Sequence, residues 1–449
     1  MANIKNMTEG KPGKLIFHFA LSLMIGNVFQ QLYTFVDTMI VGRCLGVDAL
    51  AALGATEWVT FMMFGCVQGI TQGFSISISR MFGNKDMQGL KQRIAHSVYL
   101  SVMLTIVLTV AGLLACRPLL LLLNTPEDII GYSVTYLGIL YGGVAVSVFY
   151  NLLAAILRAV GDSKTPLKAV TIASGCNIVL DVLFVVIFKW GIEGAAWATV
   201  LAQLFSALYC LKVLCGEDTL KPDKGSYHLD YVCMKEMITM GLPMGAQNII
   251  TAIGGVIVQS VINGFGILFI AGFTAANKLY GLLEIAASSY GYAVASYTGQ
   301  NMGAGLLNRI RRGLRESCIL GVVTAYMMSA IMVFLGKPIL RCFVTGDEGL
   351  ITQMVTIGYE FLIILAVFFP LLYILYIIRS CIQGMGNTLL PMVSSMVQLL
   401  MRVFCALLLT KIIGKQGVFW GEIFAWIGAD LLLLVTYLYM MQKRNNGEK

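Results

Sequence analysis

The stretch that decides the fold runs from residue 151 to Asp181 and opens with NLLAAILRAVGDSKTP. This opening predicts a helix end, a basic Gly/Pro turn and the start of a second helix. The second helix is apolar, and its polar side chains recur at steps of three and four residues, on one helical face: Thr171, Ser174, Asn177 and Asp181. A carboxylate in a membrane-length apolar segment is costly unless it faces a polar cavity or partner, so Asp181 is a functional candidate. The alternative is a packing aspartate bonded to a neighbouring helix.

The composition places this polar face inside a membrane. Of 449 residues, 58% are hydrophobic and 12% are charged, which is about half the charge of a soluble domain. No cleavable signal peptide is visible, and the short polar start predicts a cytoplasmic tail. The 11 cysteines occur singly and the 3 histidines lie far apart. We therefore expect no disulfides, no metal centre and no cofactor other than a coupling ion.

Twelve apolar segments are long enough to cross a bilayer, which predicts an all-α membrane protein. Their expected bounds are 14–42, 48–78, 92–116, 129–151, 164–188, 192–214, 236–264, 269–299, 310–335, 350–378, 388–412 and 418–442. Most of the 31 lysines and arginines lie in alternate loops, on the same side as both chain ends. This positive-inside bias predicts a multi-pass plasma-membrane protein with both termini in the cytoplasm. It also explains the net charge of +8 without a nucleic-acid partner.

The longest polar stretch divides the chain into two halves of six segments. We expect an N-terminal bundle over 1–215, a cytoplasmic linker over 216–235 and a C-terminal bundle over 236–449. The chain has no phosphate-binding loop of the kind that ATPases use, so neither ATP hydrolysis nor an ATPase subunit is implied.

The two halves resemble each other in sequence. Gly83 corresponds to Gly303, and the turn RAVGDSKTP at 158–166 corresponds to QGMGNTLLP at 383–391. Two six-helix repeats of one orientation, with a central cavity, are a plan of secondary transporters. The expected function is therefore transport of small molecules rather than enzymatic catalysis.

Several motifs resemble those of the MATE (multidrug and toxic compound extrusion) family, and in particular its DinF-like branch. They are VDTMIVGR at 36–43, DALAALG at 48–54, LRAVGDSKTP at 157–166, NIVLD at 177–181, GAAWAT at 194–199 and GQNMGAG at 299–305. The resemblance covers both halves. It implies a V-shaped pair of six-helix bundles that exports amphipathic, often cationic, organic compounds by antiport with protons or sodium ions.

A second polar stripe lies on the first segment and ends in a carboxylate: Gln30, Tyr33, Thr34 and Asp37. At about 1.5 Å of rise per residue, Asp37, Asp181 and Thr199 all fall roughly 9–12 Å below the outer ends of their segments. This shared depth predicts one chamber. Desolvation and a neighbouring negative charge favour the protonated form of a carboxyl. We therefore expect the two aspartates to carry the coupling proton.

Asn177, one turn before Asp181, is expected to position that proton. The resemblance to the DinF-like branch implies the same site and adds Gln30, Tyr33 and Thr199 as residues of the substrate cavity, where the stripe also places Thr34. The alternative is a hydrogen-bonded network that braces the bundle, because polar residues also hold membrane helices together.

Two positions depart from the NorM-like branch. Its acidic residues in segments seven and ten fall on or near Thr251 and Leu372 here, which weakens a sodium site in the second half. Sodium binding in the first half stays open. A flippase for polyprenyl-linked or lipid precursors is another alternative, although it would favour a cationic cavity. A membrane scaffold or sensor would not need repeated segments with acids at matched depth.

The second half lacks the acid pair, since Asp37, Asp181 and Asn177 correspond to Ile257, Ala406 and Arg402. The depth estimate places three charged residues near the midplane of this half: Lys278, Glu360 and Arg402. We expect Glu360 to neutralise one or both cations, with Glu284 and Asp430 as reserve partners, because lone charges there are costly. This network either braces the second bundle or lines the cavity and selects substrates.

Overall fold

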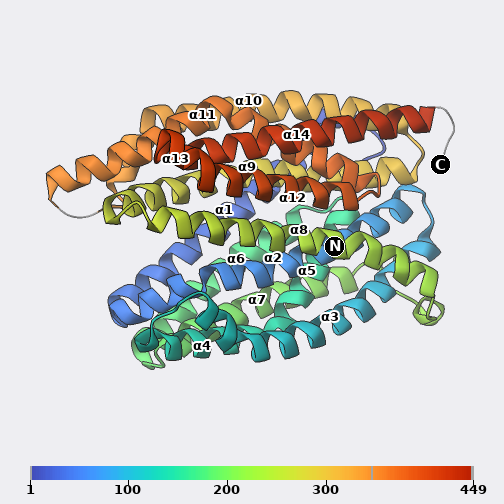
Figure 1. Cartoon of the computed structure of the whole chain (residues 1–449). Coiled ribbons are helices and arrows are strands. Elements are labelled where there is room, and N and C mark those ends of the chain that lie inside the picture. The colour runs from blue at the N-terminus through green and yellow to red at the C-terminus, as the bar shows by residue number, and fades with distance from the viewer. Residues whose placement is uncertain (1–2, 345–346, 446–449) are drawn as a thin grey trace. The chain divides into compact units, whose positions relative to one another are not determined.

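A computed structural model describes residues 3–344 and 347–445. All regular structure in these residues is helical, as the sequence predicted, and Figure 1 shows the elements along the chain. The helices are α1 (Pro12–Cys44), α2 (Val47–Gly83), α3 (Met87–Leu122), α4 (Glu127–Gly142), α5 (Val144–Ala159), α6 (Lys164–Asp181), η1 (Val182–Ile187), α7 (Ile192–Cys215), η2 (Lys224–Tyr227), α8 (Tyr231–Asn263), α9 (Ile267–Gly303), α10 (Leu307–Arg341), α11 (Glu348–Gly384), α12 (Leu389–Phe404), η3 (Cys405–Leu409), α13 (Thr410–Ile413) and α14 (Gln416–Asn445).

Each of the twelve predicted segments falls on one helix or on a broken helix. Ten helices in the described residues are long and apolar enough to cross a membrane, and the bent pair α4 and α5 adds an eleventh span. This pair bends by 49° at Gly143. Helix α9 has 37 residues, carries Lys278 and Glu284 within its length, and is not among these spans. The chain is therefore a multi-pass membrane protein.

The described residues form two compact units. The first unit comprises Met1–Thr8, Ser22–Asn248 and Gly299–Gly305, and the second comprises Glu9–Leu21, Ile249–Thr298 and Leu306–Lys449. These limits cross the division at 216–235 that the polar stretch suggested. The polar stretch and the first half of α8 belong to the first unit, and the start of α1 belongs to the second.

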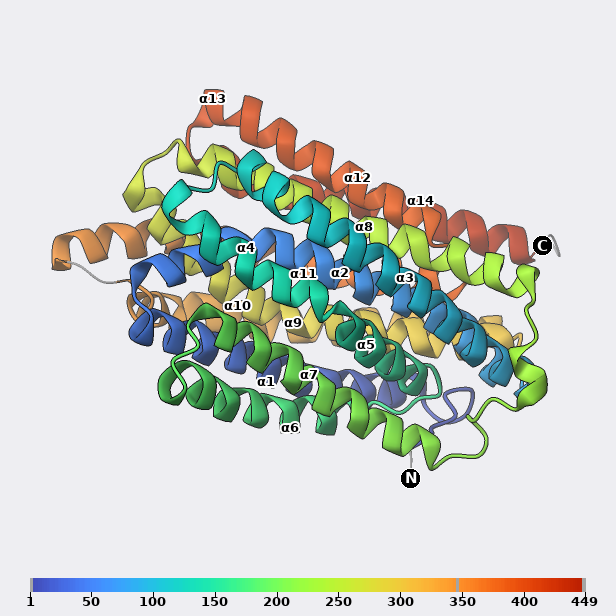
Figure 2. The same ribbon diagram turned by 90° about the horizontal axis from the view of Figure 1, so that it is seen from below.

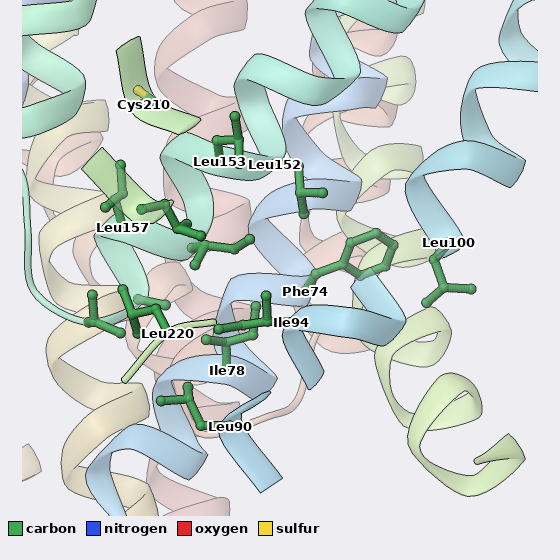
Figure 3. Packing of buried hydrophobic residues seen from close by; sticks show 14 of the residues in the cluster. Phe74, Ile78, Leu90, Ile94, Leu100, Leu152, Leu153, Leu157, Cys210 and Leu220 are labelled. Carbon is green, nitrogen blue, oxygen red and sulfur yellow. The ribbon is translucent and has the colours of Figure 1, made fainter. Parts of the chain in front are cut away.

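Within the first unit, α2 packs against α3, α4 and α5, and α7 packs against α4, α5 and α6. Figure 2 shows α6 and α7 side by side as an antiparallel hairpin. Apolar side chains fill the space between α2, α3, α5 and α7, and Figure 3 shows the packing of Phe74, Ile78, Ile94, Leu153 and Leu157. This core holds the helices that carry the polar residues.

Within the second unit, α10 packs against α11, and α14 packs against both α11 and α12. Figures 1 and 2 both show that the start of α11 projects beyond α13 and the start of α14. Equal distances from the helix starts therefore do not mean equal depths in this unit.

The internal repeat is visible in the backbone of each unit taken by itself. Gly161 and Gly386 both adopt φ of 87°, a left-handed conformation that glycine tolerates best. The next residue caps the following helix in both cases. Asp162 accepts from the backbone N–H of Thr165 at 3.0 Å, and Asn387 accepts from that of Leu390 at 3.1 Å. The alignment of the two turns is thus confirmed by their geometry.

Candidate functional site

Two buried carboxyl groups of the first unit share one site. Asp37, on α1, is 7% exposed, and Asp181, the last residue of α6, is 0% exposed. The two are close enough for the charge of Asp37 to act on Asp181. The proximity expected from their equal depth is therefore present, while their role in transport stays a prediction.

Two tyrosines complete the surroundings of the acid pair. Tyr33 lies one helical turn before Asp37. It interacts with Gln30 and lies within electrostatic range of both aspartates. Tyr136, on α4, is buried and feels the charges of Asp37 and Asp181 as well. Tyr136 was not among the residues predicted from the sequence. Its only signal was a tyrosine in an apolar span, which is also how an ordinary packing residue looks.

Several polar atoms of this site have no hydrogen-bond partner in the described part of the chain. They are Asp37 Oδ1, both oxygens of Asp181, and the side-chain oxygen and nitrogen of Asn177. Asn177 is 0% exposed and lies one turn before Asp181. Buried polar atoms are nearly always hydrogen-bonded, and an exception calls for an explanation such as strain, a catalytic role, a water or an ion. Carboxylate and amide oxygens suit a proton, a small hard cation or an organic cation.

The backbone changes its winding immediately after Asp181. Residues Val182–Ile187 form a π-helix, η1, and Cys405–Leu409, which overlaps the corresponding stretch of the second repeat, forms another, η3. Short π segments interrupt α-helices most often at functional sites, where they redirect neighbouring side chains. Nothing in the amino-acid pattern predicted them. The local geometry therefore sets Asp181 at a break in its helix.

The remaining predicted cavity residues lie on the expected helices with different degrees of exposure. Gln30 and Thr34 are exposed on α1, and the Thr34 hydroxyl donates to the backbone oxygen of Gln30 at 3.1 Å. Thr199 is half-buried on α7, which packs against α6. Gln30 thus joins the acid pair through Tyr33, whereas the Thr34 hydroxyl is engaged by its own helix.

The charges of the second unit pair differently from the expectation. Arg402 binds Glu422, with Nη2 2.7 Å from Oε2, so Arg402 is not neutralised by Glu360 as predicted. Glu360 instead lies 3.8 Å from the amine of Lys415 and is 43% exposed. The projection of α11 beyond the start of α14 explains the error, because it places Glu360 beside a residue that precedes α14. Lys278 is exposed on α9.

A family model and several known proteins match this chain over most of its length. The family model described as MatE matches residues 22–183 and 243–408. The probable multidrug resistance protein YpnP of Bacillus subtilis is 28% identical over 438 residues, which cover 97% of this chain and 96% of that protein. The probable multidrug resistance protein NorM of Thermotoga maritima is 23% identical, with 97% of this chain and 93% of that protein covered.

The fold also matches solved structures. A MOP superfamily transporter from Pyrococcus furiosus, described as having a binding pocket of reverse polarity, superposes with a TM-score of 0.90. The match covers 99% of this chain and 98% of that chain, at 24% sequence identity.

Proposed function

This chain belongs to the MatE family of multidrug efflux transporters, and we propose that it is a secondary antiporter that exports amphipathic organic cations in exchange for protons. The observation that carries the proposal is the acid pair of the first unit. Asp37 and Asp181 are buried in membrane-spanning helices, act on each other electrostatically and include oxygens without a hydrogen-bond partner among residues 3–344 and 347–445. Such carboxyls mark ion and proton pathways.

Competition for the same negative charge accounts for antiport. When the acid pair is deprotonated, its charge attracts an organic cation, while Tyr33 and Tyr136 offer aromatic faces beside it. When protons occupy the pair, the charge is lost and the cation is released. Because each ligand weakens binding of the other by the same factor, an inward proton gradient drives the cation outward once the two sides are reached alternately.

The direction of export follows from the orientation that the basic loops favour. With both termini in the cytoplasm, the turn that contains Arg158 and Lys164 faces the cytoplasm, and Asp181 lies nearer the outer end of its span. The cation then enters from the cytoplasm or the inner leaflet and leaves outward.

Efflux from proteoliposomes tests the function and identifies the coupling ion. Vesicles loaded with a cationic dye receive either a proton gradient or a sodium gradient, never both. We expect the proton gradient alone to accelerate dye efflux. Efflux driven only by the sodium gradient would show that sodium, not the proton, is the coupling ion. Absence of dye movement, together with movement of a fluorescent polyprenyl or phospholipid analogue, would favour the flippase alternative.

Thiol labelling tests the alternating exposure of the site. In a variant without the 11 native cysteines, Thr34→Cys places a thiol at an exposed position one turn before Asp37. A membrane-impermeant thiol reagent applied from outside should label it at a rate that changes with pH and with substrate. A second variant that retains only Cys44, exposed at the end of α1, should label at a constant rate. Equal behaviour of both thiols would contradict alternating access.

A further inference from the structure

Five charged side chains of the second unit come from four helices and form what we name the charged cluster: Glu284 on α9, Arg379 on α11, Arg402 on α12, and Glu422 and Asp430 on α14. Glu422 and Asp430 stand eight residues apart on one face of α14, about 12 Å at the helical rise. None of these positions corresponds to the acid pair of the first unit.

The best-compensated members are Arg402 and Glu422. Their side chains are 16% and 17% exposed and meet at 2.7 Å, which is the length of a charge-assisted hydrogen bond. Helices α12 and α14 pack against each other along this pair. Both groups therefore stay charged, and together they contribute no net charge.

Glu284 has a hydrogen-bond donor and a cation within range. The hydroxyl of Tyr376 donates to its Oε1 at 2.8 Å. The charges of Arg402 and Glu422 also reach Glu284, with opposite signs. Burial disfavours the ionised form of Glu284, whereas the Tyr376 hydroxyl and the Arg402 guanidinium favour it.

Arg379 and Asp430 are compensated least. Arg379 is 5% exposed, and its Nη2 donates to Gln398 at 3.1 Å and to Ser394 at 3.3 Å, both of them neutral. The Nε of Arg379 and both oxygens of Asp430 are buried and have no partner among the residues that the structure describes. The Arg379 guanidinium and the Asp430 carboxyl interact electrostatically, but no nitrogen of the one lies within 4.0 Å of an oxygen of the other. An ionised Asp430 would therefore carry a negative charge with no hydrogen-bond donor to its oxygens among the described residues.

Other ionisable side chains are packed around the cluster. Those that face Glu284 or Asp430 are Tyr280 on α9, Cys318 on α10, and Tyr373 and Tyr376 on α11, all of them neutral at physiological pH. On α8, Gly254 faces Arg402, and residues 249–263 contain no ionisable side chain. Among these interacting groups, only the five cluster members can carry a charge at physiological pH.

The three acids exceed the two arginines by one negative charge. An uncompensated charge within a membrane span is costly, and a single proton removes it. We propose that the second unit holds one exchangeable proton on Asp430, at a site separate from Asp37 and Asp181. The cluster is then neutral: Glu284 and Glu422 are ionised, Arg379 and Arg402 balance them, and Asp430 is a carboxylic acid.

This site gives the second unit a protonation step of its own. Loss of the proton leaves Asp430 charged beside Arg379, whose present bonds to Gln398 and Ser394 are to neutral groups, so that a closer ion pair can form. The contribution of this step to transport rests on the proposed proton coupling. The presence of the proton does not, so the two proposals can fail separately.

Infrared spectroscopy of the full chain in lipid tests the site directly. A protonated carboxyl has its own C=O stretching band, which shifts in D2O if the proton exchanges with solvent. We expect Asp430→Asn to remove one such band, and Glu422→Gln to remove none, because Glu422 is ionised in its pair. Asp430→Glu should retain the band at a shifted position. An unchanged band pattern in Asp430→Asn would overturn the proposal.

Two further measurements keep this result distinct from the proposed function. The Asp430 band should persist in a variant that carries Asp37→Asn and Asp181→Asn, whatever that variant transports. In proteoliposomes, Asp430→Asn should still export dye but move fewer protons per dye molecule than the wild type. An unchanged ratio of protons to dye would show that the Asp430 proton has no part in the transport cycle and would overturn that half of the inference.

Discussion

The two units share a repeated backbone but handle charge in opposite ways. In the first unit, Asn177 is an amide one turn before Asp181, and the acid pair has no arginine at the equivalent place. In the second, that position is Arg402, which binds Glu422. A cation at this point forms an ion pair with Glu422, whereas the first unit has an amide there and its acid pair has oxygens without a partner in the described residues. The comparison teaches that the residue at one equivalent position, Asn177 or Arg402, decides whether a fixed ion pair forms there.

The largest expected effect is on the acid pair. Asp181→Asn removes the ionisable group but keeps the shape and polarity of the side chain, so the protein should remain folded in the membrane and lose gradient-driven dye efflux. Asp37→Asn should do the same. Asp128→Asn, at the exposed start of α4, is the matched control and should retain efflux. Full efflux by both acid-pair variants would show that Asp37 and Asp181 do not couple efflux to the gradient.

The Arg402–Glu422 pair of the second unit should respond in stability rather than in coupling. Glu422→Gln leaves Arg402 without its 2.7 Å partner, and breaking a buried pair costs about 3 kcal/mol. We expect a lower melting temperature and reduced membrane expression. Glu348→Gln, at the exposed start of α11, should change neither. Normal stability of Glu422→Gln together with an altered drug profile would show that the pair selects substrates instead.

Two tyrosine variants should show the same difference between the units through smaller effects on stability and dye binding. Tyr376→Phe removes the hydroxyl that donates to Glu284 at 2.8 Å, which should lower the free energy of unfolding by about 1 kcal/mol. Tyr136→Leu removes the aromatic face beside the acid pair, so its main effect should be dye binding that is weakened several-fold. Thermal unfolding and dye titration of both variants check this. The reverse assignment, with Tyr136 stabilising and Tyr376 binding, would contradict the distinction.

The smallest effect concerns a carboxylate outside both sites. Asp230 caps α8, and hydrogen bonds from the backbone N–H of Cys233 and then of Val232 hold its pKa below the usual value for aspartate. Its contribution to stability is therefore complete at neutral pH and is lost as the pH falls through the lowered pKa. Asp230→Asn, which still caps a helix, should slightly reduce the acid sensitivity of the melting temperature and leave efflux unchanged. An effect on coupling would show that the loop acts on transport.

The sequence predicted the helices well because their cause is local. An apolar run bounded by glycine, proline or charges has few alternatives in a membrane, and each predicted span lies on a helix or a broken helix. The turn at Gly161 and its copy at Gly386 were also readable, since glycine and the capping residue that follows carry a specific conformation. The acid pair was found because two polar stripes end in carboxylates at one depth.

The sequence did not predict which residues of neighbouring helices contact each other. Depth gives one coordinate, and it placed Glu360 with Arg402, whereas the packing of α12 against α14 supplies Glu422. The projection of α11 beyond the start of α14 made the depth of Glu360 itself misleading. The π segments after Asp181 and Phe404 and the contribution of Tyr136 depend on three-dimensional packing, and no residue pattern announces them.

The pH dependence of dye affinity tests the central claim most directly. If protons and organic cations compete for Asp37 and Asp181, the affinity of the purified wild-type protein for a cationic dye should rise with pH, by up to about tenfold per pH unit for one proton. Asp430→Asn, which changes only the second unit, should keep that slope. Asp181→Asn, in which only Asp37 of the pair can still be protonated, should bind the dye with an affinity that depends less on pH. An unchanged slope in Asp181→Asn and in Asp37→Asn would contradict the account.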